Sequence, residues 1–217
     1  MGTITRSFAN NLTTGGVLKA DAFNNASLNN VTALNVAIAT GNMILLSSQT
    51  ASNSASISFT TGIDSTYKEY QFYFIDIHPR TDGADFEFNL STDSGSNYNV
   101  TKTTTVIYSY NNENGLAQDL LYDTGTDLAQ STSYQDINYS CGNGADESLS
   151  GSLTLFNHSS TTYVKHFILD TNLYGYADYS SRVLVAGYGN TTSAINAINF
   201  RMSSGNIDGT ILMYGIK

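Results

Sequence analysis

From Met43 onward, hydrophobic and polar residues alternate in short segments that Gly, Asn, Asp and Ser separate. The clearest segment is Asp85–Leu90, in which Phe and Leu alternate with acidic or amide residues. A period of two places the apolar side chains on one face of a strand and their neighbours on the other. Because Ala194–Met202 alternates in the same way, we expect both segments to be strands with one buried face.

The segment Tyr70–Ile77 is apolar at consecutive positions, which predicts a central strand covered on both sides. Pro79 should end it, because proline cannot donate a hydrogen bond to a neighbouring strand. The turn residues Asp93-Ser94-Gly95 stand between Asp85–Leu90 and a Thr-rich segment, 98–110. This arrangement predicts a hairpin of the two segments.

Further strand candidates recur along the rest of the chain, and no stretch of twelve residues has a persuasive 3.6-residue period. Residues 116–130 come closest, but Gly125 interrupts them. The other strand candidates are 43–46, 56–60, 118–122, 133–138, 148–156, 163–171, 182–188 and 210–216. The pattern therefore predicts an all-β fold, an antiparallel two-sheet β-sandwich that is jelly-roll-like, spanning residues 43–217.

Residues 1–42 differ from this domain because they are rich in Asn, Thr, Ala and Gly, with apolar positions too irregular to fix a helix or strand. Such a segment cannot close a core of its own. We interpret it as an extended N-terminal arm that either lies against another subunit or stays mobile. Its candidate contact residues are Phe8, Leu12, Val17, Leu18, Phe23, Leu28, Val31 and Leu34.

The composition narrows the function classes. Charged residues make up only 12% of the 217 residues, and nine Lys and Arg face eighteen Asp and Glu, for a net charge of −9. The negative charge argues against nucleic-acid binding, and no stretch approaches the roughly 20 apolar residues of a membrane span. No signal peptide is visible at the start. Cys141 has no second cysteine, which excludes a disulfide framework.

The sequence has no HExxH, GxSxG, P-loop or CxxC motif. The histidines are far apart; we expect His158 to lie in a solvated turn and His166 to have a structural role. We therefore predict no catalytic residue, no metal site and no cofactor, and expect the chain not to be an enzyme.

One group of carboxylates, Asp82, Asp85 and Glu87, has the spacing of a glycosidase pair, whereas no spaced loop motif supports a calcium site there. Carboxylates at positions i and i+2 of a strand lie about 7 Å apart, which overlaps the separation in inverting glycosidases. These side chains are expected to face solvent, where no pKa would rise enough for general-acid work. A charged outer strand face is the favoured interpretation.

Tyrosines gather in two places that cannot all be core. Tyr174, Tyr176 and Tyr179 lie in a loop-like stretch beside Gly and Asp, while Tyr108 and Tyr110 precede two asparagines. Aromatic rings among such residues suit either stacking on sugar rings or packing against another subunit. Both interpretations are open, with the interface favoured.

Longer stretches of the sequence resemble a family of proteins from tailed phages, many of them infecting marine bacteria. The resemblance lies in SISFTTGIDSTYKEYQFYFIDIHPRTDGADFEFNLSTDSGSNYN (56–99) and continues through 127–135, 148–167 and 185–217. The stretch SFANNLTTGGVLKADAFNNASLNNVTALN (7–35) is similar to openings seen in such proteins. The similarity covers most of the chain and includes no catalytic signature.

The resemblance implies a non-enzymatic virion structural protein, either a tail-fibre or tail-associated protein or a capsid decoration. It would be made in the bacterial cytoplasm and incorporated in the virion through the arm. The expected partners are further copies of the chain, as a homotrimer or other homo-oligomer, and other virion proteins. The alternative is a receptor-recognition module that binds host-surface glycan through its tyrosines; a polysaccharide depolymerase is the least favoured option. Neither nucleic acid nor membrane insertion is expected.

Overall fold

The computed structural model describes residues 42–217, so residues 1–41 of the predicted arm, with its eight candidate contact residues, lie outside the described residues. The described part contains twelve strands and no helix. The first six are β1 (Met43–Ser54), β2 (Ile57–Phe59), β3 (Glu69–Pro79), β4 (Ala84–Ser91), β5 (Lys102–Asn112) and β6 (Gln118–Tyr122). The others are β7 (Gln135–Cys141), β8 (Leu149–Phe156), β9 (Lys165–Gly175), β10 (Tyr179–Gly189), β11 (Ala197–Met202) and β12 (Ile207–Ile216).

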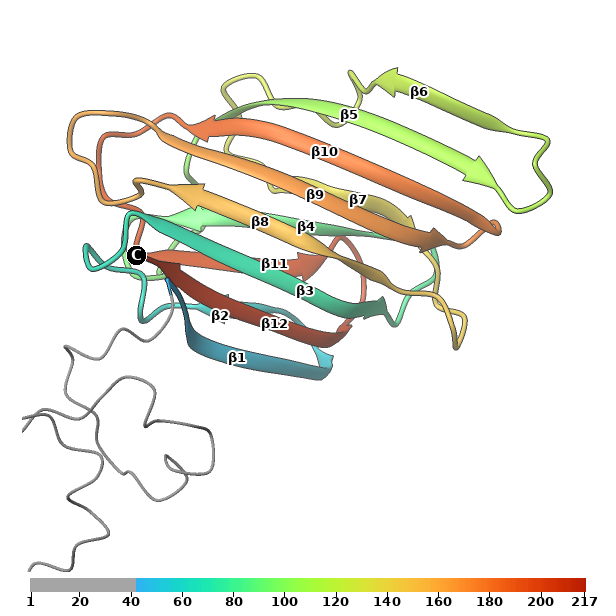
Figure 1. The fold of residues 1–217 in the computed structure, drawn as a ribbon, viewed down its shortest axis with the longest axis horizontal. Helices are drawn as coiled ribbons and strands as arrows, with labels where there is room; N and C mark the ends of the chain where they lie inside the picture. Colours follow the sequence, from blue (N-terminus) through green and yellow to red (C-terminus); the bar gives the residue numbers. More distant parts are fainter. Residues whose placement is uncertain (1–41) are drawn as a thin grey trace, which may run out of the picture. The chain divides into compact units, whose positions relative to one another are not determined.

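The strands form two layers in which all pairing is antiparallel (Figure 1). The large sheet has the order β1-β12-β3-β8-β9-β10-β5-β6, and the small sheet has the order β2-β11-β4-β7. A single pair of residues, Cys141 in β7 and Gly175 in β9, joins the sheets at one edge. The predicted antiparallel two-sheet sandwich is confirmed.

The chain passes repeatedly from one sheet to the other, which makes the sandwich jelly-roll-like. β2, β4, β7 and β11 of the small sheet are each preceded and followed by strands of the large sheet. The predicted hairpin of 85–90 with 98–110 is therefore wrong, because β4 pairs with β7 and β11 while β5 pairs with β6 and β10. Residues Asp93-Ser94-Gly95 do form a turn, in which Ser94 and Gly95 have positive φ. The chain after this turn crosses to the other layer instead of pairing with β4.

Aromatic side chains from both sheets fill the space between the layers. Phe200 of β11 lies at the centre, with its ring centroid 5.6 Å from Phe72, 5.3 Å from Phe74 and 6.0 Å from Phe86. All four rings are buried. Burial of each such ring contributes about 1.5–3 kcal/mol relative to exposure, so this cluster holds the two layers together.

The strand β3 differs from the prediction of a strand covered on both sides. Tyr70, Phe72 and Phe74 are buried between the sheets, but Tyr73 is only half-buried and Ile75 is exposed on the other face. Tyr73 instead packs edge-to-face against Tyr214 of β12, 5.7 Å away. The apolar outward residues therefore belong to the surface of the large sheet. As predicted, β3 ends at Pro79.

A bulge bends the large sheet where β3 meets β12. The pairing shifts between Asp208 and Thr210, and Asp76 on the opposite strand has a positive φ of 49°. Gly209 has a φ of 118°, and a Cβ there would lie 2.6 Å from the carbonyl oxygen of Asp76. Only glycine fits this close approach of two backbones.

Candidate functional site

The outer face of the large sheet, from β6 across to β8, carries several large apolar side chains that are exposed. Register places Tyr122 opposite Ile107, Ile107 opposite Leu184, and Ala186 opposite Ile168. Directly opposed residues share one face of a sheet, so these side chains form a continuous surface. We call this surface the apolar outer face; its members are Leu120, Tyr122, Ile107, Leu184, Ala186, Ile168, Tyr188, His166 and Phe156.

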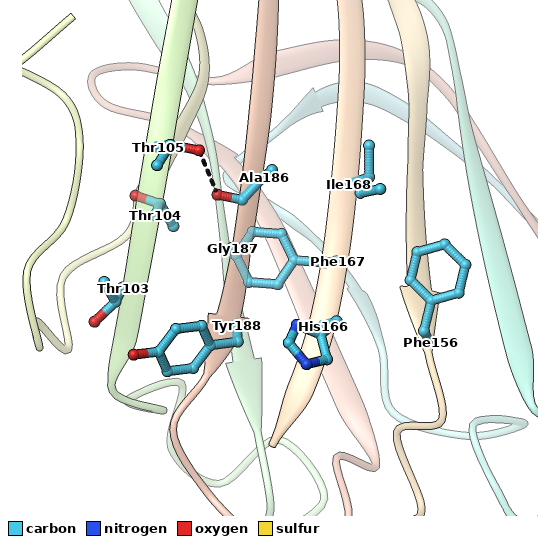
Figure 2. A pocket seen from close by; sticks show the side chains of 10 residues that line it. All are labelled: Thr103, Thr104, Thr105, Phe156, His166, Phe167, Ile168, Ala186, Gly187 and Tyr188. Carbon is cyan, nitrogen blue, oxygen red and sulfur yellow. Dashed lines mark hydrogen bonds between the residues drawn. The ribbon is translucent and has the colours of Figure 1, made fainter. Parts of the chain in front are cut away.

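The apolar outer face contains a shallow hollow of about 450 Å³. Figure 2 shows Ala186 between Thr105 and Ile168, with Tyr188 and His166 beside one another farther along the strands. Ala186 is small, and its larger neighbours on either side leave the depression. A second hollow of about 470 Å³ adjoins it, shares Phe156 and His166, and reaches the exposed Tyr163.

A different hollow, of about 310 Å³, lies at the opposite end of β5, β9 and β10. Register places Ser180 of β10 between Asn111 of β5 and Tyr174 of β9, and the turn after β5 adds Glu113. Ser180 is small, so this hollow arises as the apolar one does, but its walls carry amide, hydroxyl and carboxylate groups. We call it the polar hollow.

The five predicted ligand-binding tyrosines have three different environments. Tyr174 lines the polar hollow, and Tyr176 is exposed in the turn after β9. Tyr108 and Tyr110 lie on the inward side of β5 with ring centroids 5.5 Å apart, and Tyr110 is 6.3 Å from the buried Tyr179. Of the five, Tyr174 alone lines one of the three hollows described above, and the inward three pack against one another.

The carboxylates with glycosidase-like spacing all have structural partners. Asp82 and Asp85 accept hydrogen bonds from the backbone N–H groups of Asn143 and Ser140, at 3.2 and 2.9 Å. Glu87 pairs with Arg201 at 2.9 Å. None of them lines the hollows described above.

Asp136 is a residue that the sequence pattern did not single out; register places it opposite Glu87 on the outer face of the small sheet. Burial, followed by the negative charges of Asp85 and Glu87, raises its pKa to about 7. No local pattern marks Asp136, because its neighbours come from β4, which is far away in sequence. The raised pKa follows from burial and from the neighbouring carboxylates, and it identifies no reaction.

The environments of His158, Lys165 and His166 differ in part from those predicted. His158 is buried against Tyr70, with ring centroids 4.7 Å apart, so the prediction of a solvated turn is wrong. Burial lowers its pKa. In β9, Lys165 points inward and donates hydrogen bonds to the carbonyl oxygens of Ser160 and Tyr163, both at 2.6 Å, while His166 faces outward.

A second buried lysine, Lys102, ties the start of β5 to the small sheet. Its Nζ donates to Oδ1 of Asn89 at 2.5 Å and to the carbonyl oxygen of Val100 at 3.0 Å. Burial without an anionic partner lowers its pKa to about 7. Cys141 is also buried, which raises the pKa of its thiol to about 12 and leaves it unreactive.

Within residues 42–217, no three His, Cys, Asp or Glu side chains are placed to hold a metal ion. The same residues contain no helix that is long and apolar enough to cross a membrane.

Comparison with known proteins adds no relative: no family model, no curated protein and no solved structure matches the chain. Function is therefore inferred from the outer faces of the two sheets and from the sequence resemblance.

Proposed function

We propose that the chain is a non-enzymatic structural protein of a tailed-phage particle, and that its sandwich assembles with further copies of itself. The observation that carries the proposal is the apolar outer face of the large sheet. Ile168 is 55% exposed and Leu120 is 70% exposed, which places large aliphatic groups in water unless a partner covers them. The sequence resemblance supports the phage setting, as a tail-associated or capsid-decorating protein.

Charge favours a second copy of this chain as the partner. The members of the apolar outer face are uncharged, although Asp170, directly opposite Leu184, and Arg182, two residues before it, are on the same side of the sheet. The nearest charges on β9 and β10, Asp170 and Arg182, pair at 2.6 Å and neutralise each other. Two copies of an acidic protein repel through most surfaces, so a neutral apolar face is where self-association costs least.

Sedimentation velocity of the full chain tests this assembly. The double variant Ile107→Glu with Ile168→Glu places two carboxylates on the apolar outer face and should turn the oligomer into a monomer. Leu45→Glu is the matched control, because Leu45 is 51% exposed in β1 at the far edge of the same sheet. A monomeric wild-type chain at high concentration, or an unchanged oligomer in the double variant, would contradict the proposal.

The arm is tested separately on the phage particle. Deletion of residues 1–42 should leave residues 43–217 folded, because the strands and the buried core described above all lie within that range. We expect the shortened protein to be absent from particles, and an electron-microscopy map of the intact particle would show where the full chain sits. Normal incorporation of the shortened protein would refute the anchoring role.

A further inference from the structure

The polar hollow is built differently from a surface that another protein copy would cover. Its floor is Ser180, and its sides are Asn111 and Tyr174, which stand in one row across β5, β10 and β9. Asn172 lies two residues before Tyr174 in β9, on the same face. The turn after β5 closes one end with Glu113, whose N–H donates to the carbonyl oxygen of Asp178 at 2.9 Å.

Several polar groups of this hollow remain available to a ligand. Within residues 42–217, the side chains of Asn111 and Glu113 make no hydrogen bond, and Asn111 is on the outward side of β5 with Ser180. Asn172 uses its Nδ2 on Ser180 Oγ at 3.0 Å and on the carbonyl oxygen of Ser181 at 2.8 Å, which leaves its Oδ1 as an acceptor. The site therefore offers the free amide of Asn111, the carboxylate of Glu113 and the amide oxygen of Asn172.

Tyr174 supplies the apolar part of the site. Its hydroxyl donates to Oδ1 of Asp178 at 3.3 Å, which fixes the ring at the edge of the hollow. An aromatic ring held in place beside hydrogen-bonding groups suits a ligand with one C–H face and several hydroxyls.

We infer that the polar hollow binds a neutral saccharide, with the sugar ring against Tyr174 and its hydroxyl groups on Asn111, Glu113 and Asn172. The lining contains no Lys or Arg, and the carboxylate of Glu113 would repel an anionic sugar, a phosphate or a nucleotide. The volume of about 310 Å³ lies at the lower end of the ~300–1,000 Å³ range of ligand pockets, which suits one sugar unit at the end of a glycan.

The polar hollow and the apolar outer face are on the same side of the large sheet, and Leu120 and Asn172 stand in one row, but the hollow itself is at the opposite end of β5, β9 and β10 from the apolar hollow. The two are compatible: an oligomer would present several copies of the hollow, and linked weak sites bind far more tightly than one. A single site with so few contacts should bind in the millimolar range.

Saturation-transfer NMR on the full chain tests the site with glucose, galactose, mannose and N-acetylglucosamine, and with glucuronic acid as the anionic comparison. We expect at least one neutral sugar to bind, and Tyr174→Ala to weaken that binding tenfold or more. Tyr174→Phe should retain most of it, because the ring remains. Tyr163→Ala is the matched control, since Tyr163 is 67% exposed but lies outside the polar hollow.

Three results would overturn the inference: no binding of any neutral sugar, equal binding by wild type and Tyr174→Ala, or preferential binding of glucuronic acid. Circular dichroism of each variant excludes loss of fold as the cause. Sedimentation of the same samples reports assembly, so failure of the sugar site and failure of the assembly proposal remain distinguishable.

Discussion

The two sheets of the sandwich share one core, but the outer face of one is charged and the outer face of the other is largely apolar. On the small sheet, Arg201, Glu87 and Asp136 form one row across β11, β4 and β7. On the large sheet, the row of Thr105, Ala186 and Ile168 across β5, β10 and β9 carries no charge. Covering a charged row with a second acidic copy costs electrostatic free energy, whereas a neutral row can be covered at little such cost.

The two sheets also differ in the kind of stability cost that each tolerates. Arg201 lies 3.7 Å above the ring of Tyr134 and pairs with Glu87, so its charge is satisfied twice. Asp136 has no cationic partner among the residues described and carries the raised pKa. The small sheet therefore holds an uncompensated acid, while the large sheet leaves apolar groups in water.

The largest expected effect is on the free energy of unfolding, and it compares an inward with an outward position of β10. A Cβ on Gly187 would lie 2.6 Å from Cγ2 of Thr104 and 2.9 Å from Cζ of Phe167. Gly187→Val should therefore lower the free energy of unfolding by about 1–3 kcal/mol through overpacking. Ala186→Val, one residue earlier and facing outward, should change it by less than about 0.5 kcal/mol. Urea unfolding of both variants measures the difference; equal losses would contradict the assignment of faces.

The next effect concerns the acid on the small sheet and depends on pH. Between the ordinary Asp value of 3.8 and about 7, the folded protein holds a proton on Asp136 that the unfolded chain has released. Stability therefore falls as pH rises through this window. Asp136→Asn removes the cost and should raise the free energy of unfolding by about 1–2 kcal/mol at pH 8, with little effect at pH 4.

The exposed Asp146 provides the control, because Asp146→Asn should leave the free energy of unfolding unchanged at both pH values. Thermal unfolding at pH 4 and pH 8 measures the effect. A gain of equal size at both pH values would show that the charge of Asp136 is not its cause.

The smallest effect on stability comes from the ion pair beside the apolar outer face. Asp170 and Arg182 are both about half exposed, at 46% and 57%, so Asp170→Asn should change the free energy of unfolding by less than about 1 kcal/mol. It leaves Arg182 unpaired next to the contact surface, and we expect self-association to weaken. Glu87→Gln on the small sheet breaks the ion pair with Arg201 and should leave self-association unchanged. Sedimentation velocity of both variants measures their self-association. Weaker self-association in Glu87→Gln than in Asp170→Asn would contradict the prediction.

Much of the fold follows from local pattern. Each predicted strand segment contains or overlaps a strand, because alternation with a period of two is a property of neighbouring residues. The inward direction of Phe86, Phe88 and Leu90 was predictable for the same reason and is confirmed by their complete burial. The candidate site was harder to predict. Tyr174 was a candidate from the residues around it, but Ser180 and Glu113 lie beside it only because β5, β9 and β10 pair.

By itself, the sequence determined the strand content, the end of β3 at Pro79 and the lack of familiar catalytic motifs, since each depends on residues close together in the chain. The tertiary structure decided which strands pair, and so overturned the hairpin between 85–90 and 98–110. It also decided that Lys165 is buried while His166 faces outward, and that Asp136 meets Glu87. The physical reason is that pairing and burial depend on contacts between distant segments, and several pairings satisfy the same local alternation.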